Sequence, residues 1–318
     1  MNQNGIALLM VLCALFLMST MVMTSYHYWF DIYYLAKNSQ QRQKEKWILL
    51  GAEEKFVSEL IKNISDDRFN NNNFRRLISG GRVTSGTWNV NLKSIDNTNC
   101  FNINALKTKI SNPEEIIETY SWQVFKHLLL ISGVGVQETQ DTLDRVVELY
   151  RSNLIIEQGN NGLSTLKYIS YEVDEINISS KMNRADFLKI APMLCIRRDK
   201  KLLVNINMLD VGNNQYLQAA LLNTVSERDI YDVISAKPNN GWDNVFIFYN
   251  LLSSHSTMSG RNVNKNILDK LTVDEYFINY IFRIDHEDSY YQLITFIHAV
   301  GKSIAILNRR YSFSEQHH

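Results

Sequence analysis

The chain has 318 residues and carries 33 Lys and Arg against 33 Asp and Glu. This balance produces no extended field of one sign, so the composition does not favour a nucleic-acid-binding protein. Apolar residues make up 45% of the chain, enough for one large or two smaller cores, and three prolines argue against long extended linkers.

The first notable segment is an apolar run over residues 6–24, which contains no charge, glycine or proline. At about 1.5 Å rise per residue, such a helix crosses a hydrocarbon core of about 30 Å. Aromatic residues typical of a membrane interface follow the run: Tyr26, Tyr28, Trp29, Phe30, Tyr33 and Tyr34. We therefore predict one membrane-spanning segment that anchors a large globular body.

Several kinds of N-terminal segment are compatible with this run. A cleaved secretory signal is disfavoured, because no basic residue precedes the run and no small-x-small cleavage site follows it. A lipoprotein signal ending at Cys13 is disfavoured by the large Leu12 before it. An ordinary signal anchor remains open. The fourth reading is a prepilin-type leader, in which hydrophilic residues 1–5 end at Gly5 and cleavage exposes the apolar Ile6.

Two departures from the common prepilin pattern accompany this leader. It has no basic residue, and the fifth residue after the cleavage point is Met10, where most pilins have Glu. The positive-inside rule would also place the body in the cytoplasm, because basic residues follow the run: Lys37, Arg42, Lys44 and Lys46. We predict a periplasmic body against that rule, on the strength of the leader and of the resemblance described below.

Helix is predicted to continue from the membrane to about Ile64, because residues 31–64 contain no proline and Gly51 as their one glycine. Residues 37–46 are polar on every face, which indicates a solvated stem. Beyond them, spacings of three and four predict an apolar stripe that packs on a core. The stripe comprises Leu49, Ala52, Phe56, Leu60 and Ile64, with Val57 and Ile61 beside it.

The remaining sequence alternates between strand and helix patterns. Alternation predicts strands over 88–92 and 100–106, and residues 107–272 are predicted to be mainly helical, beginning at Asn112-Pro113. Three period-two runs joined by short turns then predict an antiparallel meander over 276–313. Strands on both sides of a helical block indicate one α+β domain with a helical domain inserted into it.

Six short stretches occur in order along the chain and carry a family resemblance. They are Gly5-Ile-Ala-Leu-Leu-Met-Val-Leu12, Gly51-Ala52-Glu53, Cys100-Phe-Asn-Ile-Asn-Ala-Leu106, Pro192-Met-Leu-Cys195, Val204-Asn-Ile-Asn207 and Gly241-Trp242. Together they resemble the K-type minor pseudopilins of bacterial type II secretion, over essentially the whole chain. The resemblance implies a pilin-like α+β fold, with a long N-terminal helix and an antiparallel sheet interrupted by a large all-α insert.

The implied domains are a leader (1–5), the membrane-spanning part of the helix (6–25), the first part of the pilin-like domain (26–106), the α-helical insert (107–272) and the C-terminal strands (273–318). The resemblance also implies a location in the bacterial inner membrane, single-pass, with the globular body in the periplasm. Prepilin peptidase is the implied processing partner at Gly5 and Ile6, with Ile6 methylated after cleavage.

The implied function is that of a minor pseudopilin at the tip of the pseudopilus. Such a subunit joins the I- and J-type minor pseudopilins, initiates filament assembly and supports export of folded proteins across the outer membrane. Family members have an apolar residue at the position of Met10. A carboxylate buried in a bilayer needs a partner, and a subunit with nothing ahead of it offers none, so Met10 suits a tip position.

Cysteines and acidic residues leave two site predictions open. Cys13 lies in the membrane run, so Cys100 and Cys195 remain as a disulfide candidate or as two separate buried thiols. Family members often carry an acidic stretch in the insert, but residues 151–167 contain Glu157 as their one acid. Calcium candidates are then Glu172, Asp174 and Glu175, with a solvated acidic loop as the alternative.

No catalytic constellation is predicted, and we do not expect an enzyme or a firmly bound cofactor. The seven histidines show no HExxH-type spacing, and Gly133-Val-Gly135 lacks the third glycine of a dinucleotide fingerprint. The alternative to the pilus function is a single-pass, membrane-anchored periplasmic binding or sensor protein unrelated to pili. The first residue of the mature protein separates the two, because cleavage leaves Ile6 and an uncleaved anchor keeps Met1.

Overall fold

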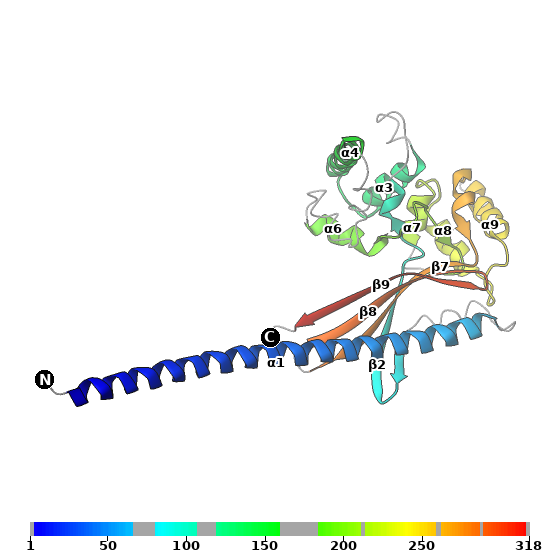
Figure 1. Ribbon diagram of the computed structural model, residues 1–318. Coiled ribbons are helices and arrows are strands. Elements are labelled where there is room, and N and C mark those ends of the chain that lie inside the picture. The colour runs from blue at the N-terminus through cyan, green and yellow to red at the C-terminus, as the bar shows by residue number, and fades with distance from the viewer. Residues whose placement is uncertain are drawn as a thin grey trace.

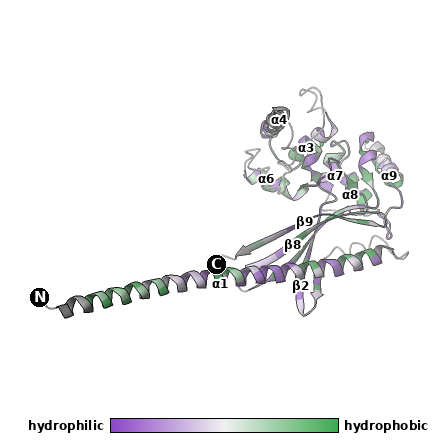
Figure 2. Ribbon diagram, in the orientation of Figure 1, coloured by the Kyte–Doolittle hydropathy of each residue, from purple (hydrophilic) through white to green (hydrophobic). Residues whose placement is uncertain are grey.

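The computed structural model describes residues 3–65, 80–106, 119–159, 184–210, 214–258, 262–286 and 289–315. A single helix, α1 (Gln3–Ser65), runs from the N-terminus into the body, which confirms the predicted continuous helix. Figure 1 shows that its N-terminal part projects away from the rest of the chain and its C-terminal part lies along the sheet. Figure 2 shows hydrophobic residues dominating the projecting part and hydrophilic residues appearing where α1 reaches the sheet.

The main sheet has five antiparallel strands in the order β1-β2-β7-β8-β9. They are β1 (Gly81–Ser85), β2 (Trp88–Asp96), β7 (Glu275–Asp285), β8 (Ser289–Val300) and β9 (Ser303–Glu315). The predicted C-terminal meander is therefore confirmed. Pairing of β2 with β7, as in Ser94 opposite Tyr280, joins the segments that precede and follow the helical block.

One core lies between α1 and this sheet. The predicted stripe is confirmed for Leu49, Ala52, Phe56 and Leu60, each at most 8% exposed. The Phe56 ring packs edge-on against the rings of two β7 residues, Tyr280 and Phe282, with centroids 4.7 and 5.9 Å away. Burying each large apolar side chain contributes about 1.5–3 kcal/mol, so the stripe is what holds α1 on the sheet.

The remaining residues of the predicted stripe differ in outcome. Val57, predicted beside the stripe, is buried as expected. Ile61 is 45% exposed, so its predicted place beside the packed stripe is wrong. The side chain of Ile64 lies outside the described residues.

A second core fills the helical insert, which lies on the far side of the sheet from α1 (Figure 1). Its α-helices are α3 (Tyr120–Ile131), α4 (Val136–Gly159), α6 (Arg184–Ile190), α7 (Asn214–Ala220), α8 (Glu227–Ser235) and α9 (Val245–Met258). Short elements complete it: η1 (Ile103–Leu106), η3 (Ala191–Met193), β4 (Leu194–Cys195), β5 (Val204–Asn205), η5 (Lys265–Lys270) and β6 (Leu271–Thr272). The predicted start signal at Asn112-Pro113 lies outside the described residues.

The predicted strand over 100–106 is mostly wrong. Only β3 (Phe101–Asn102) is extended, and the 3₁₀ helix η1 follows at once. The alternation of apolar residues with Asn suggested one buried and one wet face, yet every residue from 100 to 106 is buried. Asn102 and Asn104 are buried because their amides bond the backbone of the insert, as when Asn104 Nδ2 donates to the carbonyl of Arg197 at 2.6 Å.

Candidate assembly site on the N-terminal helix

The projecting part of α1 is an apolar cylinder that the rest of the chain leaves uncovered. Its side chains from Leu9 onward are exposed, and Met10 is 68% exposed. By length and composition this helix could cross a membrane, and the apolar window is not covered within the described chain. An exposed apolar surface of this size requires lipid or neighbouring helices. Gly5 and Ile6 lie within α1, and the free Cys13 is exposed on it.

The body begins one turn earlier than the sequence suggests. Residues 37–46 were predicted as a solvated stem, but Glu45 is fully buried, so that prediction is wrong at this position. Its Oε1 accepts a hydrogen bond from Gln41 Nε2 at 2.6 Å and lies 2.8 Å from Nε2 of His286, the residue that follows β7. A buried carboxylate needs such partners, so this contact fixes where α1 meets the sheet.

Three basic residues of the stem lie over aromatic rings of the sheet. Distances to the ring centroids are 5.1 Å for Arg42 over Phe313, 5.4 Å for Lys44 over Trp88 and 4.9 Å for Lys46 over Tyr311. Each exposed cation–π contact contributes about 0.5–1 kcal/mol. Three of the four charges that conflict with the positive-inside rule therefore help to hold α1 to the body.

The Gly51-Ala52-Glu53 stretch packs closely against the sheet. A Cβ on Gly51 would lie 3.0 Å from Ser85 Oγ, so glycine lets the β1–β2 hairpin pack against the helix. Ala52 is fully buried in the core. Glu53 is 1% exposed, accepts a hydrogen bond from Thr295 Oγ1 at 2.6 Å, and receives Arg309 Nε at 2.8 Å on its Oε2. This ion pair ties α1 to β8 and β9.

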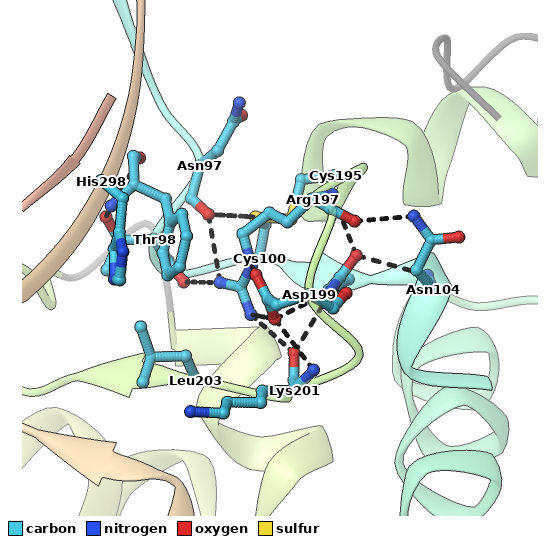
Figure 3. Close-up of polar contacts among 12 residues, drawn as sticks. Asn97, Thr98, Cys100, Asn104, Cys195, Arg197, Asp199, Lys201, Leu203 and His298 are labelled. Carbon is cyan, nitrogen blue, oxygen red and sulfur yellow. Dashed lines mark hydrogen bonds and ion pairs between the residues drawn. A yellow bond between two sulfur atoms is a disulfide. The ribbon is translucent and has the colours of Figure 1, made fainter. Parts of the chain in front are cut away.

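A disulfide and a buried polar network join the insert to the sheet. Cys100 and Cys195 are bonded in the structure, with their Cα atoms 5.7 Å apart at a sequence separation of 95. Both are buried, and the adjacent strands β3 and β4 pair in parallel. The bond therefore lies at the root of the insert, where the chain leaves the sheet (Figure 3).

Arg197 is the central polar residue of this seam, with a side chain 3% exposed. Figure 3 shows its guanidinium directed at several backbone carbonyls. It donates to the carbonyls of Thr98 at 3.3 Å and Lys201 at 2.6 Å, and its Nε lies 3.2 Å from Asp199 Oδ2. Its other face covers the Phe277 ring at 4.5 Å. A single buried cation thus links the β2–β3 connection, the insert and β7.

Sequence reasoning missed Glu45, the role of Glu53, and Arg197. A usable signal existed for the first two, because each lies beside the apolar stripe, four residues before or after Leu49. Arg197 gave no such signal, since an arginine followed by Arg198, Asp199 and two lysines looks like part of a charged surface segment.

The titratable and potential metal-ligating side chains that the structure describes include the buried Tyr216. Burial raises the pKa of Tyr216 to about 12, and its hydroxyl donates to the carbonyl of Leu203 at 3.1 Å, so it stays protonated. The calcium candidates Glu172, Asp174 and Glu175 lie outside the described residues. Within the described ranges, His, Cys, Asp and Glu form no cluster of three or more that could hold a metal ion.

Comparison with known proteins gives a consistent set of full-length matches. No protein-family model matches the sequence. The type II secretion system protein K of Pectobacterium carotovorum subsp. carotovorum is 22% identical over 335 residues, which cover 98% of this chain and 97% of the relative. The protein of the same name from Klebsiella pneumoniae is 24% identical over 324 residues, with the same coverage of both chains.

The fold also matches a solved structure, the GspK–GspI–GspJ complex from the type 2 secretion system of enterotoxigenic Escherichia coli. The TM-score is 0.62 at 16% identity, and the match covers 88% of this chain and 99% of the other. The long helix, the antiparallel sheet and the inserted helices therefore form a pilin-like fold, as predicted.

Proposed function

The chain belongs to the family of type II secretion system protein K, and we propose that it is the minor pseudopilin at the tip of the pseudopilus. In this role it joins the I- and J-type minor pseudopilins, starts the filament and supports export of folded proteins across the outer membrane. It acts as a structural subunit rather than as an enzyme.

The division of α1 into two halves carries this proposal. The second half buries the stripe around Leu49 and Phe56 on the chain's own sheet, whereas the first half exposes apolar side chains such as Met10 along its length. A helix of this kind can enter a membrane and then pack with neighbouring helices without disturbing its own domain. The solved relative assembles with GspI and GspJ, which names the partners to be tested.

Three features support the proposed location and tip position. We place the body in the periplasm, where oxidising conditions favour the bond between Cys100 and Cys195. Met10 fits the tip, because an unpaired carboxylate at that depth in the bilayer would cost about 2.5–3.5 kcal/mol. The insert, which projects beyond the sheet, would obstruct a further subunit on top (Figure 1).

Co-purification tests the assembly directly. The full-length chain, extracted in mild detergent, is expected to retain the I- and J-type pseudopilins of its own organism. Trp47 is 71% exposed and lies two residues from the buried Glu45 and Leu49, hence on the opposite side of the helix. A Trp47→Glu variant should weaken the association by about 2 kcal/mol or more, which is more than tenfold.

The matched control is Phe246→Glu, which alters a residue of the insert that is 59% exposed. This control should leave the association unchanged. Failure of the unaltered chain to retain either pseudopilin would contradict the proposed function.

Processing gives an independent prediction. We propose that prepilin peptidase cleaves after Gly5, because a residue without a side chain admits the peptidase to the backbone, and that Ile6 is then methylated. A Gly5→Leu variant should remain in the membrane at its full mass, whereas Gln3→Leu should mature normally. Intact-mass measurement distinguishes the full-length from the cleaved form of each variant. Normal maturation of Gly5→Leu would remove the main support for a prepilin-type leader.

A further inference from the structure

The seam between α1 and the edge strand β9 carries a regular set of contacts that we call the basic-aromatic ladder. Its members are Arg42, Lys46, Arg309, Tyr311 and Phe313. Residues 42, 46 and 53 of α1 share one helix face, and residues 309, 311 and 313 share one strand face. The helix and strand run in opposite directions, so that Arg42 meets Phe313, Lys46 meets Tyr311 and Glu53 meets Arg309.

This seam borders an open sheet edge. Within the described part of the chain, β9 pairs with β8 on one side and has no strand on the other. The pairing of β8 with β9 has a register shift between Phe296 and Ile297 of β8. Opposite this shift, the carbonyl of Leu307 in β9 accepts a hydrogen bond from Arg198 at 3.2 Å. Bulges and charges of this kind protect edge strands from unwanted pairing. Residues 308–313 of β9 lie beyond the register shift and continue the open edge.

The ladder has an excess of positive charge. Arg309 already forms an ion pair with the buried carboxylate of Glu53. Arg42 and Lys46 are exposed, contact ring faces, and meet no carboxylate among the side chains that the structure describes, which do not include that of Glu315. Tyr311 and Phe313 are also 39% and 37% exposed beside them. Among the described side chains, the surface therefore offers two cations without a carboxylate partner, together with two half-covered rings and a row of backbone groups.

Distance from the membrane decides what kind of partner fits. From Thr24, at the end of the apolar run, the helix rises about 27 Å to Arg42 at 1.5 Å per residue. The headgroup layer extends only about 5–8 Å beyond the hydrocarbon core on each side. The ladder therefore lies well above the lipid headgroups, at a height where neighbouring proteins are found.

We propose that the basic-aromatic ladder and the open edge of β9 take up an extended acidic segment of a partner protein as an additional strand. Backbone hydrogen bonds along residues 308–313 hold the segment, and Arg42 and Lys46 select acidic side chains on it. The proposal extends beyond the assembly role, since it does not depend on which pseudopilins the chain joins.

The probe is a fluorescein-labelled ten-residue peptide that alternates Glu with Val, offered to the full-length chain in nanodiscs of zwitterionic lipid. Anisotropy should show binding that weakens at least tenfold between 50 mM and 500 mM NaCl. The double variant Arg42→Gln/Lys46→Gln should bind at least tenfold more weakly. Its matched control, Lys44→Gln/Lys62→Gln, removes two cations from the same helix away from the ladder and should bind normally.

Hydrogen exchange separates strand addition from simple charge attraction. Bound peptide should protect backbone amides within residues 308–313 and leave those of β1, at the other sheet edge, unchanged. Arg42→Lys keeps the cation and should bind normally even if the double variant folds poorly. Four results would each overturn the proposal. They are equally tight binding of a Lys-Val peptide, an equal loss of peptide binding in the control variant, a loss of peptide binding in Arg42→Lys, and the absence of amide protection in β9. So would ladder-dependent docking onto nanodiscs of anionic lipid without any peptide binding.

Discussion

An Arg197→Met variant is expected to lose about 3–5 kcal/mol of unfolding free energy, because removing one partner of a buried, bonded charge leaves the others unsatisfied. Methionine fills a similar volume but donates nothing. The carbonyl of the buried Thr98 would then lose its donor, and the carbonyl of Lys201 and the carboxylate of Asp199 would each lose one of their partners. Urea titration of the full-length chain in non-ionic detergent, followed by circular dichroism, measures the loss.

Neighbouring substitutions make this test specific. Arg198 is the next residue, is exposed, and donates to the carbonyl of Leu307, so Arg198→Met should cost about 0.5–1 kcal/mol. Arg197→Lys keeps the charge but not the planar guanidinium that reaches several carbonyls at once. Its loss of unfolding free energy should lie between those of the two methionine variants. Equal losses for Arg197→Met and Arg198→Met would contradict the seam role given to Arg197.

Features set by local periodicity could be predicted from the sequence. The stripe at Leu49, Ala52, Phe56 and Leu60 follows from helical spacing, and the C-terminal meander follows from alternation between short turns. In both cases the signal and the structure involve residues close together in the chain. This is why the long helix, the sheet and the helical block could all be anticipated.

Buried polar residues could not be predicted in the same way, because distant segments supply their partners. Asn205 shows this: its backbone N–H donates to Asn99 Oδ1 at 2.7 Å, and its own amide donates to the carbonyl of Glu275 at 2.9 Å. From the sequence alone such an Asn indicates a turn or a wet face. Glu45 misled for the same reason, since its partner His286 is supplied by the β7–β8 turn.

The double variant Cys100→Ser/Cys195→Ser is expected to lose about 4 kcal/mol of unfolding free energy, because the bond closes a loop of roughly a hundred residues in the unfolded chain. Cys13→Ser is the matched control, since this free cysteine is exposed on the membrane part of α1 and should not affect the body. Alkylation of the unreduced, denatured chain should label Cys13 alone. Labelling of all three cysteines would show that the bond does not form in the protein.

The disulfide and Arg197 should also prove to be coupled. Cys195 and Arg197 are two residues apart, and the carbonyl oxygen of Asn97 lies 3.0 Å from Sγ of the disulfide-bonded Cys100 and accepts a hydrogen bond from Nη1 of Arg197 at 3.4 Å. Once the bond is absent, the seam can relax, and the arginine then has less native geometry to hold. Combining the cysteine double variant with Arg197→Met should therefore cost less than the sum of the two losses, by about 0.5–3 kcal/mol. Simple additivity in urea titrations would mean that the covalent and polar parts of the seam hold the insert independently.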